Sequence, residues 1–110
     1  MEEYIKVDLD SAEKRLGMNK DFLINLINKL LNGDMLDKAE VAFNENNLEE
    51  AKLHIHSIKG ATASVGLDGL HELALHIETR IKEESYLDFE KLKIMREIWE
   101  ELKIKDFNNL

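Results

Sequence analysis

The sequence has no cysteine and no proline, and only five of its 110 residues are glycine. Without cysteine, disulfide scaffolds, zinc–thiolate sites and thiol catalysis are excluded. Without proline, the residue that breaks helix interiors most strongly is missing, so long uninterrupted helices are possible. Strand signals are scarce too, because no alternating run of β-branched residues lies between turn residues. These absences favour an all-α fold.

Long hydrophobic runs and excess positive charge are also lacking. No apolar stretch approaches the roughly 20 residues that span a bilayer, and the first residues, Met-Glu-Glu, are acidic, unlike a signal peptide. We therefore expect a cytoplasmic protein. The formal net charge is −8, whereas nucleic-acid binders usually carry a basic face, so neither nucleic acid nor a membrane is an expected partner. The length suits a single domain over residues 1–110.

Apolar residues recur at helical spacing along most of the chain. The spacing predicts a short helix that ends at Gly17, and a long helix over about residues 20–44 that Asn19 caps and that continues through Gly33-Asp34. Three further helices are predicted, the first opening at Asn47 and ending at Gly66, the second capped by Asp68 and the third capped by Ser85. Four long amphipathic helices with short connections predict an antiparallel up-down-up-down four-helix bundle, with a short extra N-terminal helix. We expect a monomer.

The helix after Asn47 leaves an unusual outer face. Its apolar stripe includes Ile55 and Ile58, so Lys52, His56, Lys59, Gly60 and Ala63 fall on the opposite side, where residues three and four apart are neighbours. A glycine within a helix costs about 0.5–1 kcal/mol relative to alanine. One use for it is bare helix surface that lets another molecule approach the imidazole of His56.

Such a site suits phosphoryl chemistry. Imidazole has a pKa of about 6.5 without neighbours, so much of it is neutral and nucleophilic near neutral pH, and it can hold a phosphoryl group covalently. A lysine one turn away can partly neutralise the added charge. The sequence has no phosphate-binding glycine loop and no kinase signature, so magnesium and most transition-state stabilisation would come from a partner. These features predict a phosphoryl carrier that binds no cofactor or metal, not an autonomous enzyme.

The run His56-Ser57-Ile58-Lys59-Gly60 resembles the His-x-x-Lys-Gly signature of histidine-containing phosphotransfer domains. The similarity continues in Val7–Asp10, in Arg15-Leu16-Gly17, in the small residues 61–63, and in Gly66, Leu70 and Glu78. The resemblance implies a helical bundle with His56 as the phosphoacceptor, Lys59 supporting the phosphoryl group and Gly60 giving clearance. The implied partners are response-regulator receiver domains, which supply the magnesium, and a sensor or hybrid histidine kinase. Lys52 and Ala63 would contact the partner.

Two other functions remain open at this point. The same patch could belong to a helical docking bundle that binds a receiver or kinase without being phosphorylated, which would tolerate the loss of His56. A metal-binding or hydrolytic bundle would need inward-facing ligands such as Glu-x-x-His pairs, and the predicted core stripes are apolar. Glu72 and His76 lie four residues apart, but two ligands without a third make a weak site, and His54 and His71 have no evident role.

Overall fold

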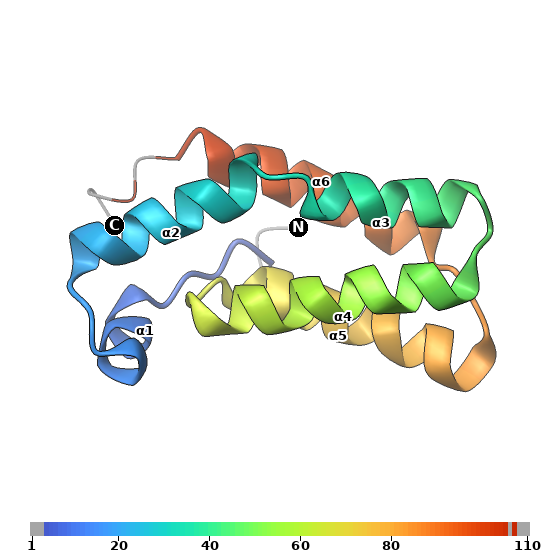
Figure 1. Ribbon diagram of the computed structural model, residues 1–110, viewed down its shortest axis with the longest axis horizontal. Coiled ribbons are helices and arrows are strands. Elements are labelled where there is room, and N and C mark those ends of the chain that lie inside the picture. The colour runs from blue at the N-terminus through green and yellow to red at the C-terminus, as the bar shows by residue number, and fades with distance from the viewer. Residues whose placement is uncertain (1–3, 106, 108–110) are drawn as a thin grey trace.

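The computed structural model describes residues 4–105 and 107, and within them the chain forms six helices and no strand. The all-α prediction is therefore confirmed. In chain order the helices are α1 (Leu9–Leu16), α2 (Lys20–Asn32), α3 (Met35–Asn44), α4 (Leu48–Ser64), α5 (Asp68–Glu84) and α6 (Phe89–Lys103). Figure 1 shows α2 and α3 following one another along one side, while α4, α5 and α6 each run along the length of the molecule beside them. The molecule measures 39 × 24 × 23 Å.

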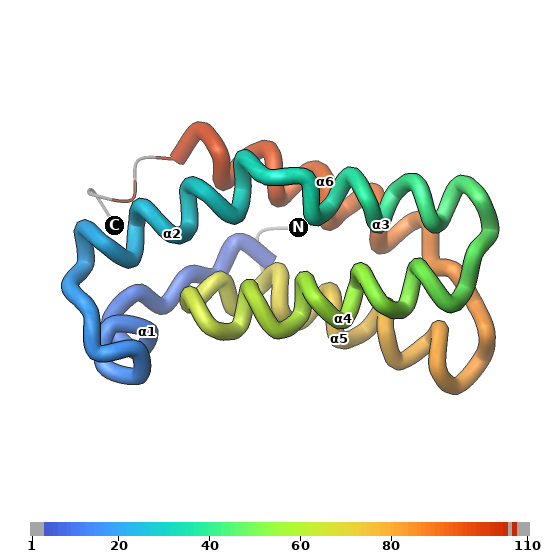
Figure 2. The backbone as a smooth tube through the Cα atoms, in the orientation of Figure 1, coloured from blue at the N-terminus to red at the C-terminus, as the bar shows by residue number. Residues whose placement is uncertain are grey.

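The prediction of a single helix over residues 20–44 is wrong. The chain leaves the helical path at Gly33, whose φ of −82° and ψ of −173° are extended, and Figure 2 shows the backbone straighten between α2 and α3. Glycine gives up a helical conformation at low cost, and Asp34 then precedes the first residue of α3. The apolar phase misled the prediction because it continues across the break, where Leu31 and Leu36 both enter the core.

The other predicted helix ends were right in part. Asn19 and Asn47 cap α2 and α4 as expected, each accepting a hydrogen bond from the third residue on, Phe22 or Glu50. Ser85 does not cap the last helix but ends α5 in a left-handed conformation with φ of 51°.

Two more helix starts differ from the prediction. Asp88 caps α6 through the Lys91 amide, whereas Asp68 is the first residue of α5 and no cap. A short polar side chain near a helix start is a frequent cap, and spacing alone did not separate Ser85 from Asp88.

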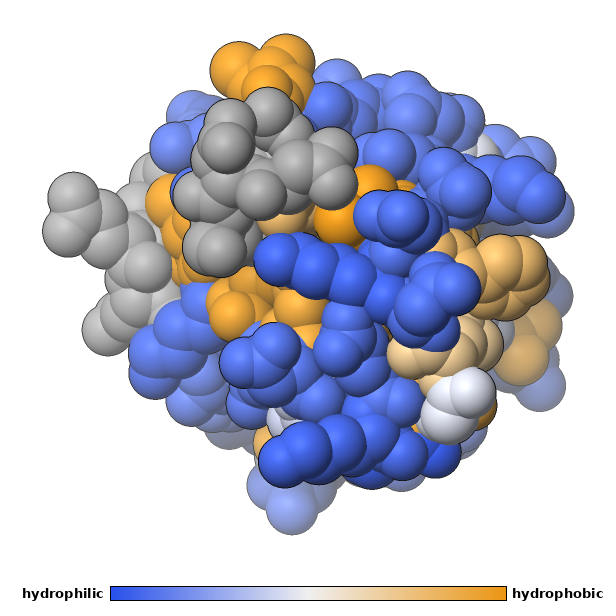
Figure 3. Space-filling view, turned by 90° about the vertical axis from the view of Figure 1, so that its left-hand side faces the viewer, coloured by the Kyte–Doolittle hydropathy of each residue, from blue (hydrophilic) through white to orange (hydrophobic). Residues whose placement is uncertain are grey.

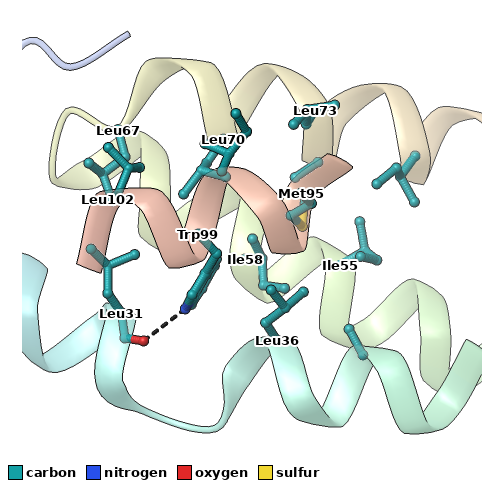
Figure 4. Close-up of a cluster of buried hydrophobic side chains, with 14 of the residues drawn as sticks. Leu31, Leu36, Ile55, Ile58, Leu67, Leu70, Leu73, Met95, Trp99 and Leu102 are labelled. Carbon is teal, nitrogen blue, oxygen red and sulfur yellow. Dashed lines mark hydrogen bonds between the residues drawn. The ribbon is translucent and has the colours of Figure 1, made fainter. Parts of the chain in front are cut away.

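The core lies between the long helices, and large apolar side chains fill it (Figure 4). Phe89, the first residue of α6, is half exposed and packs edge-on against Phe43, with 5.4 Å between the ring centroids. Trp99 is the largest fully buried side chain, and its indole nitrogen donates a hydrogen bond of 2.8 Å to the Leu31 carbonyl. Arg96 of α6 ties that helix to α3 by ion pairs with Asp37 and Glu40.

The segment before α1 packs against the turn between α4 and α5. The Asp8 amide donates to the Gly66 carbonyl, and the Gly69 amide donates to the Lys6 carbonyl. A Cβ at Gly69 would stand 1.8 Å from the Tyr4 carbonyl oxygen, so only glycine allows this approach. This end of the molecule, with α1 and the start of α2, presents a mostly hydrophilic surface with smaller apolar patches (Figure 3).

Candidate functional site

His56 lies at the middle of α4 on its outer face, with 62% of its side chain exposed. The helix sets this position, because Ile55 and Ile58 are fully buried and fix which side of α4 meets the core. Lys52, Gly60 and Ala63 follow the same outer side, where Lys52 and Gly60 are exposed and Ala63 is half-buried. The structure thus brings the residues predicted from the sequence onto one surface.

A carboxylate that the sequence analysis did not select as a site residue lies beneath this surface. Glu78 comes from α5 and is only 2% exposed. Its Oε2 lies 2.6 Å from Nδ1 of His56, and its Oε1 lies 2.5 Å from Nζ of Lys59. Nζ of Lys82, one turn further along α5, is 3.7 Å from the same Oε1. Glu78 therefore joins the histidine and the lysine of the motif across two helices.

These contacts keep Glu78 ionised. Burial acts to raise the pKa of Glu78, but hydrogen bonds from Lys59 and His56, with the charges of Lys59 and Lys82, outweigh it, so the pKa lies below its ordinary value. An ionised carboxylate only accepts hydrogen bonds, so Nδ1 of His56 must donate one. In the neutral ring the lone pair is then on Nε2, at the exposed side of the imidazole.

A periodic signal for Glu78 was present in the sequence. On α5 the buried positions include Leu70, Ala74, Ile77 and Ile81, and Glu78 lies four residues after Ala74 on the same side. A glutamate in a buried phase is almost always paired. The partner could not be read from one chain segment, because the pairing crosses from α5 to α4.

A shallow groove of about 500 Å³ runs beside His56. His56, Glu78 and Lys82 line it together with residues from the first half of α4, including Lys52 and the exposed Leu53. Beyond Leu53, a second groove of about 320 Å³ lies between α3 and α4. The histidine is therefore open to a macromolecule on this face and is not enclosed in a small-molecule cavity.

The remaining histidines have local roles or stay exposed. Nε2 of His54 is 3.3 Å from Glu50 within α4, and Nδ1 of His71 is 3.1 Å from the Lys59 carbonyl. His76 is exposed, and Glu72 is exposed beside it. In residues 4–105 and 107, no three side chains of the metal-ligating types come together, and no helix is long and apolar enough to cross a membrane.

Comparison with known families gives one match. The model of the Hpt domain matches residues 26–103, which is most of the chain. The chain belongs to the Hpt domain family. The suspected resemblance is thereby confirmed, and the matched range covers α3, α4, α5 and α6 with most of α2. Hpt domains are phosphotransfer carriers of two-component phosphorelays and interact there with receiver domains and histidine kinases. No curated protein and no solved structure matches the chain significantly.

Proposed function

We propose that this Hpt domain accepts a phosphoryl group on Nε2 of His56 from the aspartate of one receiver domain and passes it to another receiver. The observation that carries the proposal is the pair of His56 with the buried Glu78, which leaves the second ring nitrogen free at the surface. The fold supports it as well, since we take α2 and α3 together as one arm of an up-down-up-down four-helix bundle. We further propose that residues 1–110 act as one monomeric domain in the cytoplasm.

The transfer step needs no proton to leave the histidine. The lone pair of Nε2 attacks phosphorus, a nitrogen–phosphorus bond forms, and the bond between phosphorus and the aspartate oxygen breaks with its electrons going to the aspartate carboxylate. The ring then carries positive charge while Nδ1 keeps its proton. The carboxylate of Glu78, 2.6 Å from Nδ1, stabilises this charged ring. Passing the group to a second aspartate is the same step in reverse.

Other residues of the surface support the step without changing bonds. Lys59 supplies positive charge next to the site. Gly60 gives clearance, because apart from its chain neighbours and the nearby backbone of α4 no atom lies within 4 Å of where its Cβ would be. Ala63 and Lys52 extend the surface along α4 toward a bound receiver. In this proposal Mg²⁺ belongs to the receiver, where it offsets charge on the phosphoryl oxygens, and this chain contributes neither a cofactor nor kinase activity.

The experiment is a transfer assay with the parent and two histidine variants. Receiver domains charged by a small phosphodonor and magnesium are mixed with the parent, with His56→Gln and with the matched control His76→Gln, which changes an exposed histidine on α5. We expect acid-labile, alkali-stable label on the parent and on His76→Gln, and none on His56→Gln. Equal labelling of His56→Gln would refute the assignment of the phosphoacceptor.

The same assay separates the carrier from a docking bundle. A bundle that only binds receivers would form a complex without any label, and its affinity would be unchanged in His56→Gln. Titration calorimetry with an unphosphorylated receiver, run beside the transfer assay, distinguishes these two outcomes.

A further inference from the structure

The charged groups around Glu78 are held with very different strength. Lys59 approaches Oε1 to 2.5 Å and has only 23% of its side chain exposed, whereas Lys82 stays 3.7 Å from the same atom with 51% exposed. The first distance is that of a short charge-assisted hydrogen bond, and the second is too long for a hydrogen bond. Lys59 and Lys82 therefore stand in different relations to the site.

Lys59 is tied to its present position. If its amine turned toward a phosphoryl group on Nε2, the buried Glu78 would lose its closest cation, and a buried carboxylate without its partner is strongly destabilised. The aliphatic part of the half-buried Lys59 side chain would also lose packing contacts. Lys59 therefore contributes most by keeping Glu78 ionised and in place beneath the histidine.

Lys82 can move toward the phosphoryl group at little cost. It lines the groove beside His56, and Glu78 keeps both Lys59 and His56 as partners when Lys82 leaves. Helical side chains lean toward the N-terminus of their own helix. Because Lys82 lies one turn after Glu78 on α5, it leans back over Glu78 and so toward His56.

Lys52 lines the same groove but has the opposite geometry. It lies one turn before His56 on α4, so its side chain leans away from the histidine toward the start of that helix. Of the lysines that line the groove, Lys82 is therefore the better placed to meet charge that develops on Nε2.

We propose that Lys82 binds the phosphoryl oxygens on phosphorylated His56, whereas Lys59 is a positioning residue that acts through Glu78. This inference rests on the proposed carrier function, and it changes the role that the family resemblance implied for Lys59. In the unphosphorylated protein Lys82 lies 3.7 Å from Glu78. In the phosphorylated protein it turns toward the phosphoryl group on His56. Lys82 thereby favours the phosphorylated state of the domain.

In the test, phosphoramidate phosphorylates the whole chain without any receiver, and the phosphohistidine is then titrated by ³¹P NMR. A cation that binds the phosphoryl oxygens lowers the pKa of the phosphoryl group. We expect Lys82→Gln to raise that pKa by about 0.2 to 0.7 unit, in line with the strength of exposed ion pairs, and Lys82→Arg to restore it. Lys52→Gln should shift it less, and the distant control Lys93→Gln on α6 should leave it at the parental value.

The possible failures are distinguishable. If His56 takes label but the phosphoryl pKa is the same in Lys82→Gln and the parent, the inference is wrong and the carrier function stands. A larger shift in Lys59→Gln than in Lys82→Gln also overturns it. If neither phosphoramidate nor charged receivers label His56, both the carrier function and the inference fall. Because Lys82 is exposed, its variants should fold, and circular dichroism checks this.

Discussion

At the scale of single residues, the carboxylate of Glu78 determines which nitrogen of His56 is free. Nδ1 faces the carboxylate at 2.6 Å, so the imidazole is held in one tautomer and one orientation. A carboxylate that accepts a hydrogen bond from an imidazole fixes the orientation of the ring and raises its basicity, as carboxylates do behind metal-ligating histidines.

Replacing this carboxylate should slow phosphorylation without removing the phosphoacceptor. We expect Glu78→Gln to lower the initial rate of labelling from a charged receiver by about tenfold to a hundredfold, since the amide binds the charged ring weakly. The matched control is Glu72→Gln, an exposed change on the same helix, which should keep the parental rate. Unchanged labelling in Glu78→Gln would mean that the pair is structural only.

Two glycines should respond in opposite ways to the same substitution. A Cβ at Gly60 meets no atom within 4 Å, so Gly60→Ala should stabilise α4 by up to about 1 kcal/mol. The added methyl should nevertheless reduce transfer from a receiver, because it stands on the open surface beside His56. Labelling by phosphoramidate, which needs no docking, should be unaffected.

Gly69→Ala supplies the contrasting case. Its Cβ would stand 1.8 Å from the Tyr4 carbonyl oxygen, so the segment before α1 would have to move, and we expect a lower melting temperature. Thermal unfolding followed by circular dichroism compares both variants with the parent. A destabilised Gly60→Ala would contradict the open surface assigned to this position.

At the scale of elements, the break between α2 and α3 leaves a backbone carbonyl to which Trp99 of α6 donates a hydrogen bond. The last four carbonyls of a helix have no partner within it, and Leu31 lies in the last turn of α2. The indole of Trp99 donates to that carbonyl from α6, as the dashed line in Figure 4 shows. The tryptophan thus satisfies a group that the end of α2 leaves free.

Trp99→Phe should therefore destabilise the fold through one lost donor and a smaller ring. We expect a loss of about 2–4 kcal/mol in the free energy of unfolding, from an unpaired buried carbonyl and a cavity. The control Phe22→Leu changes an exposed aromatic residue of α2 and should cost little. Urea unfolding followed by circular dichroism measures both, and a near-neutral Trp99→Phe would show that water replaces the indole.

The helices themselves were predictable, but their junctions were less so. The Asn19 and Asn47 caps are local signals and were read correctly, whereas the apolar periodicity continues across Gly33 and was misread there as one helix. Whether Gly33 interrupts a helix depends on what the freed carbonyls can bind, here the distant Trp99. The site divides in the same way: spacing on α4 identified the surface around His56, and the resemblance included Glu78, but the pairing of Glu78 with His56 and Lys59 required knowledge of how α5 packs on α4.

At the scale of the whole molecule, Glu78 links the site to stability. Its pKa is lowered in the folded state, so its ionised form stabilises the fold above the ordinary carboxyl pKa, and this contribution is lost as pH falls through the folded value. We expect the stability difference between the parent and Glu78→Gln to be largest near neutral pH and to shrink below about pH 4. Urea midpoints across this range measure it, and a difference that grows on acidification would contradict the sign.

The placement of His56 halfway along α4, on an open flank with no enclosing wall, also limits how a relay could use the domain. In the proposed relay every receiver docks on this flank, so two receivers would not occupy it together, and each would have to leave before the next arrives. An uncharged receiver in excess would hold the face and delay the others. The rate at which each receiver is phosphorylated would then depend on the relative concentrations of the receivers as much as on their reactivity, so the receivers would compete for the domain.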